Sequence, residues 1–194
     1  MANVSDVKSK FFEPDGVDDD QVSATGTATT LVIADGGPYG NLTETITIKS
    51  AAGNNTGNTF TITGTDGNGD AQTEDVTGPT AGATVNSANK YLTVTSIVSD
   101  GAIVTDIQAG ILGTGALTGT VFAGRTRIRG ITGTSKASAG NIVFKNTSIT
   151  GTSLLTIPLT GAVSSIDPYI PDNGVLFDAG AYVNLTAADV TGVT

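Results

Sequence analysis

The sequence predicts an all-β protein with two small antiparallel β-sandwich or barrel-like domains in tandem, behind an extended N-terminal arm. Three observations lead to this prediction. Apolar residues make up only 38% of the 194 residues, and the abundant Thr and Gly suit pleated strands and tight turns. From residue 25 onward, segments that alternate between apolar and polar residues recur along the chain. Turn-forming Gly, Asn, Asp and Pro separate these segments at near-regular intervals.

Residues 1–24 form the predicted arm. The arm contains an aromatic pair, Phe11 and Phe12, and an acidic run, Asp18, Asp19 and Asp20. Because this segment shows neither a helical nor a strand period, it cannot bury itself. Two interpretations remain open. The arm is a disordered tail, or it becomes ordered on a neighbouring subunit with the Phe pair as its anchor.

The first domain is predicted over residues 25–120. Its clearest strand covers residues 42–49, where Leu42, Ile46 and Ile48 share one face. The stretch from Asp66 to Asp70 forms a predicted hairpin tip, because Gly, Asn and Asp favour such turns. Further strands are predicted at residues 29–34, 59–64, 71–76, 90–98 and 103–111.

The second domain is predicted over residues 121–194. Residues 112–124 are uncharged and rich in Gly. This composition favours a connection between domains, and it places the boundary near residues 120–124. The strands of the second domain are predicted at residues 125–131, 141–145, 153–159, 175–177, 181–185 and 190–194.

Composition and charge exclude several classes of function. The chain contains no His and no Cys, which removes the usual nucleophile–base pairs and zinc sites. Glu44 and Glu74 are the glutamates nearest each other in a plausible strand frame, and both are expected on wet, polar faces. We therefore expect a non-enzymatic protein. The formal charge of −9 argues against nucleic acid and anionic membranes as partners, and the first residues do not resemble a signal peptide.

One stretch is a weak candidate for a calcium site. Asp66, Asn68 and Asp70 carry side-chain oxygens at alternate positions, as at the start of a calcium-binding loop. The bidentate Glu that such a loop needs at its twelfth position is replaced by Thr77. A hairpin turn explains the same residues, so no cofactor is predicted.

A basic strip is the second candidate site. Arg125, Arg127 and Arg129 occupy alternate positions and therefore share one face of a strand. Three neighbouring guanidinium groups repel one another unless acidic groups lie close to them. The partners are either carboxylates of the same chain or an acidic surface of a neighbour, such as its Asp18–Asp20 run.

Two parts of the chain resemble known proteins. The stretch NTFTITGTDGNGDAQTE at residues 58–74, followed by YLTVTSI at residues 91–97, resembles a β-domain of tailed-bacteriophage virion proteins. The stretch IPDNGVLFDAGAYVNLT at residues 170–186 resembles the closing hairpin of small phage head-decoration proteins.

The resemblance implies a virion component without an active site. The first expectation is a capsid decoration (cement) protein on the outer surface of the head, with the major capsid protein or other virion proteins as partners. Such a protein is expected to be a homo-oligomer, either a trimer or a dimer. The alternatives are a tail, collar or fibre component that contacts the host surface, and a cell-surface adhesin-like β-module.

Overall fold

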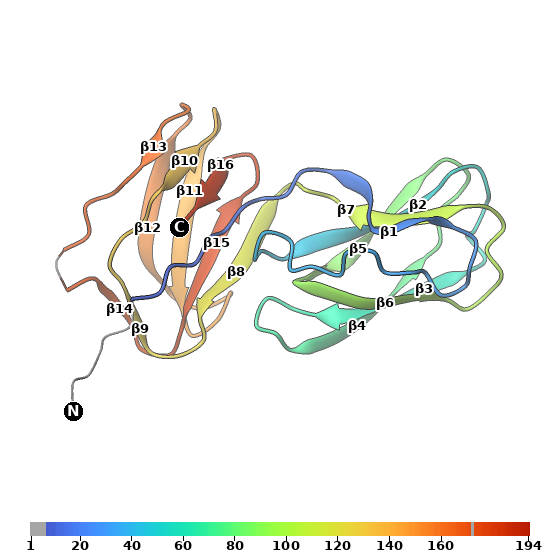
Figure 1. Ribbon diagram of the computed structural model, residues 1–194, viewed down its shortest axis with the longest axis horizontal. Helices are drawn as coiled ribbons and strands as arrows, with labels where there is room; N and C mark the ends of the chain where they lie inside the picture. Colours follow the sequence, from blue (N-terminus) through green and yellow to red (C-terminus); the bar gives the residue numbers. More distant parts are fainter. Residues whose placement is uncertain (1–6, 172) are drawn as a thin grey trace.

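The computed structural model describes residues 7–171 and 173–194, which form strands, turns and loops. Figure 1 shows two groups of antiparallel sheets arranged in line along the longest axis of the molecule. The predicted all-β class is therefore confirmed. No helix in the described part of the chain has the length and apolar character needed to cross a membrane.

In the first domain, a four-stranded sheet and a three-stranded sheet share one core. Buried Ile46 and Ile48 of strand β2 (Glu44–Ser50) alternate with polar residues, and Phe60 and Ile62 of β3 (Thr59–Thr65) do the same in the second sheet. The alternation at residues 42–49 and 59–64 thus predicted both strands. The first sheet has the order β1 (Asp18–Gly26), β7 (Ile107–Ile111), β2, β5 (Thr84–Tyr91), and the second has β4 (Ala71–Thr77), β3, β6 (Thr93–Ser99).

The second domain consists of a four-stranded sheet, a three-stranded sheet and a two-stranded pair. Buried Phe144 of β11 pairs with Val183 of β15, and both belong to one apolar core. The four-stranded sheet has the order β12 (Ser153–Thr160), β11 (Ala139–Asn146), β15 (Ala181–Thr186), β8 (Ala116–Phe122). The other strands are β13 (Ser165–Ile166), β10 (Gly133–Ser135) and β16 (Val190–Val193) in one sheet, and β14 (Val175–Phe177) and β9 (Thr126–Ile128) in a short pair.

Three predicted strands of the first domain differ from the structure. The strand predicted at residues 103–111 begins only at Ile107, as β7. The predicted strand at residues 90–98 is divided at Leu92, where the chain passes from β5 in one sheet to β6 in the other. Residues 29–34 form no extended strand. Thr30 makes only an isolated bridge with Val98, although Leu31 is buried in the core. A short apolar run therefore indicated burial correctly but not pairing.

The domain boundary also lies earlier than residues 120–124. Strand β8 begins at Ala116 and pairs with β15, so it belongs to the second domain, and the connection is the short segment between Ile111 and Ala116. The Gly-rich composition that predicted a linker has another cause. A side chain at Gly119 would collide with the ring of Phe12 and with the carbonyl oxygen of Asn41.

Part of the predicted arm at residues 1–24 is a strand of the first domain, and another part pairs with the last strand of the second domain. Residues 18–26 form β1, which pairs with β7 at the edge of the first domain. Before β1, Phe12 forms an antiparallel bridge with Val193. The Phe12 amide donates to the Val193 carbonyl at 2.7 Å, and the Val193 amide donates to the Phe12 carbonyl at 2.8 Å. Residues 1–6 of the predicted arm lie outside the described residues.

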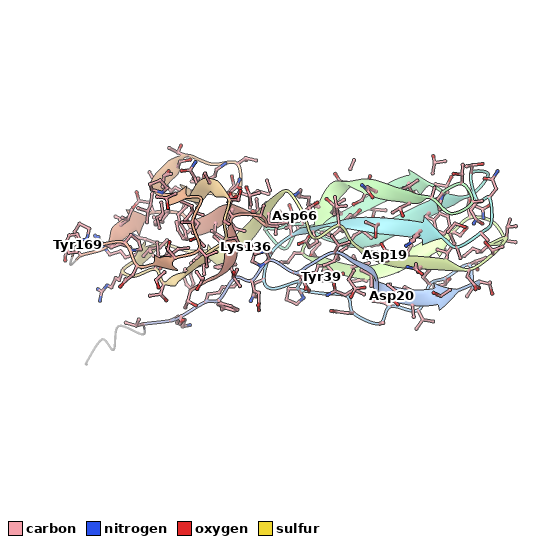
Figure 2. The ribbon with its side chains drawn as sticks, turned by 90° about the horizontal axis from the view of Figure 1, so that it is seen from above. Asp19, Asp20, Tyr39, Asp66, Lys136 and Tyr169 are labelled. Atoms are coloured by element: carbon pink, nitrogen blue, oxygen red, sulfur yellow. The ribbon has the colours of Figure 1, made fainter. Side chains whose placement is uncertain are left out.

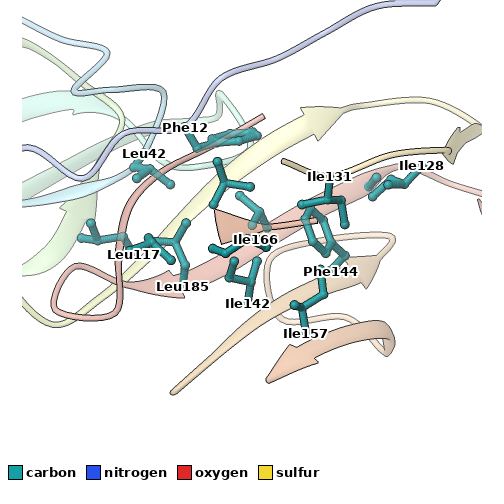
Figure 3. Packing of buried hydrophobic residues seen from close by; sticks show 14 of the residues in the cluster. Phe12, Leu42, Leu117, Ile128, Ile131, Ile142, Phe144, Ile157, Ile166 and Leu185 are labelled. Carbon is teal, nitrogen blue, oxygen red and sulfur yellow. The ribbon is translucent and has the colours of Figure 1, made fainter. Parts of the chain in front are cut away.

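The two members of the Phe pair lie on opposite sides of this bridge, because successive side chains of extended backbone point in opposite directions. The side chain of Phe12 is only 2% exposed and belongs to the core of the second domain. Leu42 enters the same core from the first domain, and Figure 3 shows both residues above Leu117. Phe11 is 48% exposed and its ring lies against Gly192. The expectation that Phe12 anchors a neighbouring subunit is therefore corrected, since this chain buries it.

Direct hydrogen bonds also join the two domains. The Thr43 amide donates to the Thr118 carbonyl at 2.8 Å, and the two side-chain hydroxyls lie 2.9 Å apart. The Leu112 amide donates to the Thr45 carbonyl at 2.9 Å. These bonds connect β2 of the first domain to β8 and the segment before it, so the domains form one unit.

The position of Phe12 predicts a large difference between two similar substitutions. Phe12→Ala should lower the free energy of unfolding by about 3–5 kcal/mol, because it leaves a cavity in the second core. The matched control Phe11→Ala should cost less than about 1 kcal/mol, since half of that ring is already in water. Urea denaturation of the two variants measures the difference. Equal losses would contradict the burial of Phe12 in its own chain.

Candidate interaction surfaces

The second domain has a concave surface, lined by the arm and by residues around β9, which we call the basic groove. It has a volume of about 920 Å³. Its apolar part includes Phe12, Ile128, Phe144 and Val193. Five of the nine Lys and Arg side chains of the protein line it: Lys8, Lys10, Arg125, Arg127 and Arg129. An apolar floor with cationic walls suits an acidic protein segment that also carries an apolar side chain.

Strand β9 and the residues on either side of it place the three arginines on the groove, since the strand predicted at residues 125–131 covers only residues 126–128. Ile128 points inward and is buried, while Arg127 and Arg129 on either side of it are exposed, as the period of a strand requires. The predicted common face of the arginines agrees with this arrangement. Arg125 has a carboxylate near it, with its Nε atom 3.8 Å from Asp178 Oδ1, but both side chains are more than 70% exposed. Such an ion pair contributes little to stability.

Arg127 uses part of its guanidinium group within the chain. Its Nη1 atom donates to the carbonyl oxygens of Asn173 and Gly174, at 3.0 Å and 3.4 Å. These contacts orient the side chain without neutralising its charge. Among the described residues, no carboxylate lies at ion-pair distance from Arg127 or Arg129. Within residues 7–171 and 173–194, the intra-chain interpretation of the basic strip is therefore supported for Arg125.

The arm supplies a wall of the groove that the sequence alone did not indicate. Lys10 donates from Nζ to the Thr120 carbonyl at 2.6 Å and lies 5.5 Å from the centre of the Phe12 ring. Burial lowers the pKa of Lys10 below its ordinary value. Lys8 and Val7 line the groove beside it. The bridge between Phe12 and Val193 thus holds two lysines next to the arginines of β9.

An acidic surface lies further along the same segment. We call residues Val17–Asp20 the acidic edge, because β1 is an outer strand of its sheet. Asp19 forms an ion pair with Lys49 of the same chain, whereas Asp18 and Asp20 are exposed (Figure 2 labels Asp19 and Asp20). A hydrogen bond with the Asp18 side chain and repulsion by its charge raise the pKa of Asp20.

The calcium candidate has a structural role in its hairpin. Asp66 Oδ1 accepts hydrogen bonds from the amides of Asn68 and Asp70, at 2.8 Å and 2.9 Å, and so closes the turn between β3 and β4. The described residues contain no group of three or more acidic side chains placed to hold a metal ion. The hairpin tip instead contacts the second domain, where Thr120 Oγ1 donates to the Gly67 carbonyl at 2.6 Å.

Glu44 is a buried carboxylate at the junction of the domains. Glu44 is 0% exposed, and neither carboxylate oxygen makes a hydrogen bond of good geometry, although the backbone amides of Gly113 and Thr45 lie near them. Burial raises the pKa of Glu44 to about 7, while the charge of Lys90 and the amides of Gly113 and Thr45 oppose part of this increase. The expectation of a wet face was therefore wrong for Glu44. The sequence did contain an indication of this burial, because Glu44 alternates in step with Leu42, Ile46 and Ile48 and therefore lies on the same face of the strand.

Glu74 differs from Glu44. Its carboxylate is partly exposed and accepts hydrogen bonds from the amides of Ala88 and Asn89, at 2.6 Å and 2.8 Å. Glu74 therefore connects β4 to β5, which belong to different sheets. Neither glutamate lines the basic groove.

Comparison with known proteins returned no match, whether to a family model, to a curated protein or to a solved structure.

The buried Glu44 predicts that stability falls as the pH rises. Its folded-state pKa lies above the unfolded value, so its contribution to stability is fully present below about pH 4.5 and is lost through about pH 7. The side chain at position 44 of Glu44→Gln cannot ionise, so this loss is absent from the variant. The free energy of unfolding of the variant, measured relative to that of the wild type, should therefore rise by about 2–3 kcal/mol between pH 5 and pH 8. Urea denaturation at both pH values measures this change. The exposed Glu13→Gln serves as control, and a wild-type profile parallel to that of Glu44→Gln would refute the prediction.

Proposed function

We propose that this chain is a non-enzymatic structural protein of a bacteriophage virion, a decoration protein that binds the outer surface of the capsid. The resemblance of residues 58–74, 91–97 and 170–186 to phage virion proteins gives the class. The observation that carries the proposal is that the chain joins its two sandwiches in line as one unit (Figures 1 and 2). A protein bound in many copies to a shell gains from fixed geometry, because binding then orders fewer groups.

The bonds between the domains support a fixed unit. The contacts of Thr43 with Thr118 and the bond from Thr120 to Gly67 cross from one domain to the other, and the bridge of Phe12 with Val193 fixes the arm to the second domain. The arm then continues into β1 of the first domain. A chain that is connected at three places has little freedom for its domains to turn against each other.

The distribution of charge supports a position outside a shell filled with nucleic acid. Residues 13–115 contain thirteen Asp and Glu but only two Lys, whereas residues 116–194 contain four Asp and five Lys and Arg. The first domain is therefore repelled by nucleic acid. On the outside of the head, this domain would point away from the shell and the second domain would lie nearer to it.

The environment of Glu44 supports the non-enzymatic part of the proposal. Strongly shifted pKa values often mark active sites, because catalysis needs tuned acids and bases. The carboxylate of Glu44 has such a shift, but it is sealed between the domains and no substrate could touch it. Its shift is a consequence of the domain junction.

Cryo-electron microscopy of the virion tests the proposal. The expected result is density for paired sandwiches at regular positions on the head surface, and binding of the purified protein to shells assembled from the major capsid protein alone. Density confined to the tail, together with no binding to such shells, would reject the decoration role.

A tail or fibre component is the second candidate, and one observation favours it. Tyr169 is 87% exposed in the loop between Pro168 and Pro171, at the end of the molecule that lies away from the first domain (Figure 2). An exposed aromatic ring on a stiff loop suits contact with a host surface. Binding of the labelled protein to host cells, and its loss in Tyr169→Ala, would support this candidate over the first.

A further inference from the structure

The basic groove and the acidic edge are complementary in charge and in apolar content. The groove carries Arg127 and Arg129, which have no carboxylate partner in the described part of the chain. The acidic edge carries Asp18 and Asp20, which are exposed. Arg binds carboxylates through two parallel hydrogen bonds, which gives such pairs both strength and a defined orientation.

Apolar side chains accompany the charges on both surfaces. Val17 of the acidic edge is 65% exposed directly before Asp18. At the groove, Val7 is 77% exposed and Phe122 is 45% exposed. An association that covers these side chains would remove apolar surface from water in addition to pairing charges.

The groove cannot bind the acidic edge of its own chain. Phe12 is fixed to Val193 in the second domain, and Asp18 is fixed to Ile111 in the first. The arm between Lys10 and Asp18 runs across the junction of the domains, and a chain segment of this length spans at most about 28 Å. Both ends of the segment are fixed, so the two surfaces of one chain cannot meet. The complementary surface must therefore come from another molecule.

We propose that the basic groove binds the acidic edge of a second copy of this chain, so that two copies pair with their arms antiparallel. Figures 1 and 2 show the arm along a single side of the molecule, and Figure 2 labels Asp19 and Asp20 where the arm enters the first domain. The residues at the start of the described part of the arm, Val7 to Lys10, line the groove. A two-fold axis across the arm then places each groove on the acidic edge of the other copy. Such a contact is closed, because both complementary surfaces of each copy are used.

A different explanation exists for the acidic edge alone. Charged residues on an outer strand prevent it from pairing with strands of other molecules. This explanation accounts for Asp18 and Asp20, but not for the concentration of five of nine cations in one groove. The two explanations predict different oligomeric states, so the mass in solution decides between them.

The experiment measures the mass of the full chain by sedimentation equilibrium, with two charge-reversal variants. The first variant is Arg127→Glu with Arg129→Glu, and the second is Asp18→Lys with Asp20→Lys. We expect the wild type to be a dimer at 50 mM NaCl, with a dissociation constant at least tenfold larger at 500 mM because salt screens exposed charges. Each variant alone should be a monomer, since its two reversed side chains then face side chains of the same sign on the other copy.

An equimolar mixture of the two variants gives the decisive result. In the mixed pair, the reversed positions 127 and 129 of one copy face the reversed positions 18 and 20 of the other, and the remaining groove and edge keep their native charges. Both contacts are then complementary, so the mixture should form a heterodimer with the mass of the wild-type pair. Far-UV circular dichroism and thermal unfolding establish that each variant is folded.

Two further variants are matched controls. Lys145→Glu and Asp106→Lys reverse charges in the second and first domains, outside the groove and the acidic edge, and should leave the dimer intact. A wild type that is monomeric at every concentration would assign the groove to a foreign partner or to residues 1–6, and would overturn the proposal. A mixture of variants that stays monomeric, or open polymers of the wild type, would also overturn it. Pairing is independent of the virion role, because a dimer that does not bind capsids rejects only the proposed function.

Discussion

The burial of Phe12 in the second domain is the contact on which the rest of the arrangement depends. This residue precedes the whole first domain, yet its ring completes a core that, apart from Leu42, is built from residues after position 115. Its backbone pairs with Val193, which lies 181 residues later in the chain. Because β1 begins at Asp18, only a few residues remain to cross the junction. The position of the first domain against the second is therefore limited by the length of this short segment.

The start of β2 shows how closely the two domains share residues. Leu42 packs in the second core, the backbone and hydroxyl of Thr43 bond to Thr118, and Glu44 is buried between the domains. A buried carboxylate without hydrogen bonds is unfavourable unless it is protonated or close to a cation. Lys90 lies near enough to lower the pKa of Glu44 and donates to the Ala116 carbonyl of β8. The junction thus combines apolar packing with one costly polar group, and this combination makes its stability depend on pH.

Patterns of neighbouring residues predicted the features that depend on neighbouring residues, namely strands and the faces on which their side chains lie. Alternation identified β2 and β3 because one face of each strand is buried, and it placed Arg125, Arg127 and Arg129 on a common outer face. Contacts between distant residues were beyond such patterns. Nothing near Phe12 indicates Val193, and nothing near Lys10 indicates β9. The Gly content of β8 led to its prediction as a linker, although Leu117 and Val121 alternate around Gly119 as in a strand. In the structure, Gly119 is required because the Phe12 ring lies against it.

The same bridge that joins the domains also forms the basic groove. Lys8 and Lys10 reach the arginines of β9 because Phe12 holds the arm against β16. Strand β16 lies near residue 190, so this wall of the groove exists only after nearly all of the chain shown here has folded. A partially folded chain would carry the acidic edge without the complete groove. Association through the groove would then be restricted to molecules whose two domains are already joined, which couples assembly to completed folding.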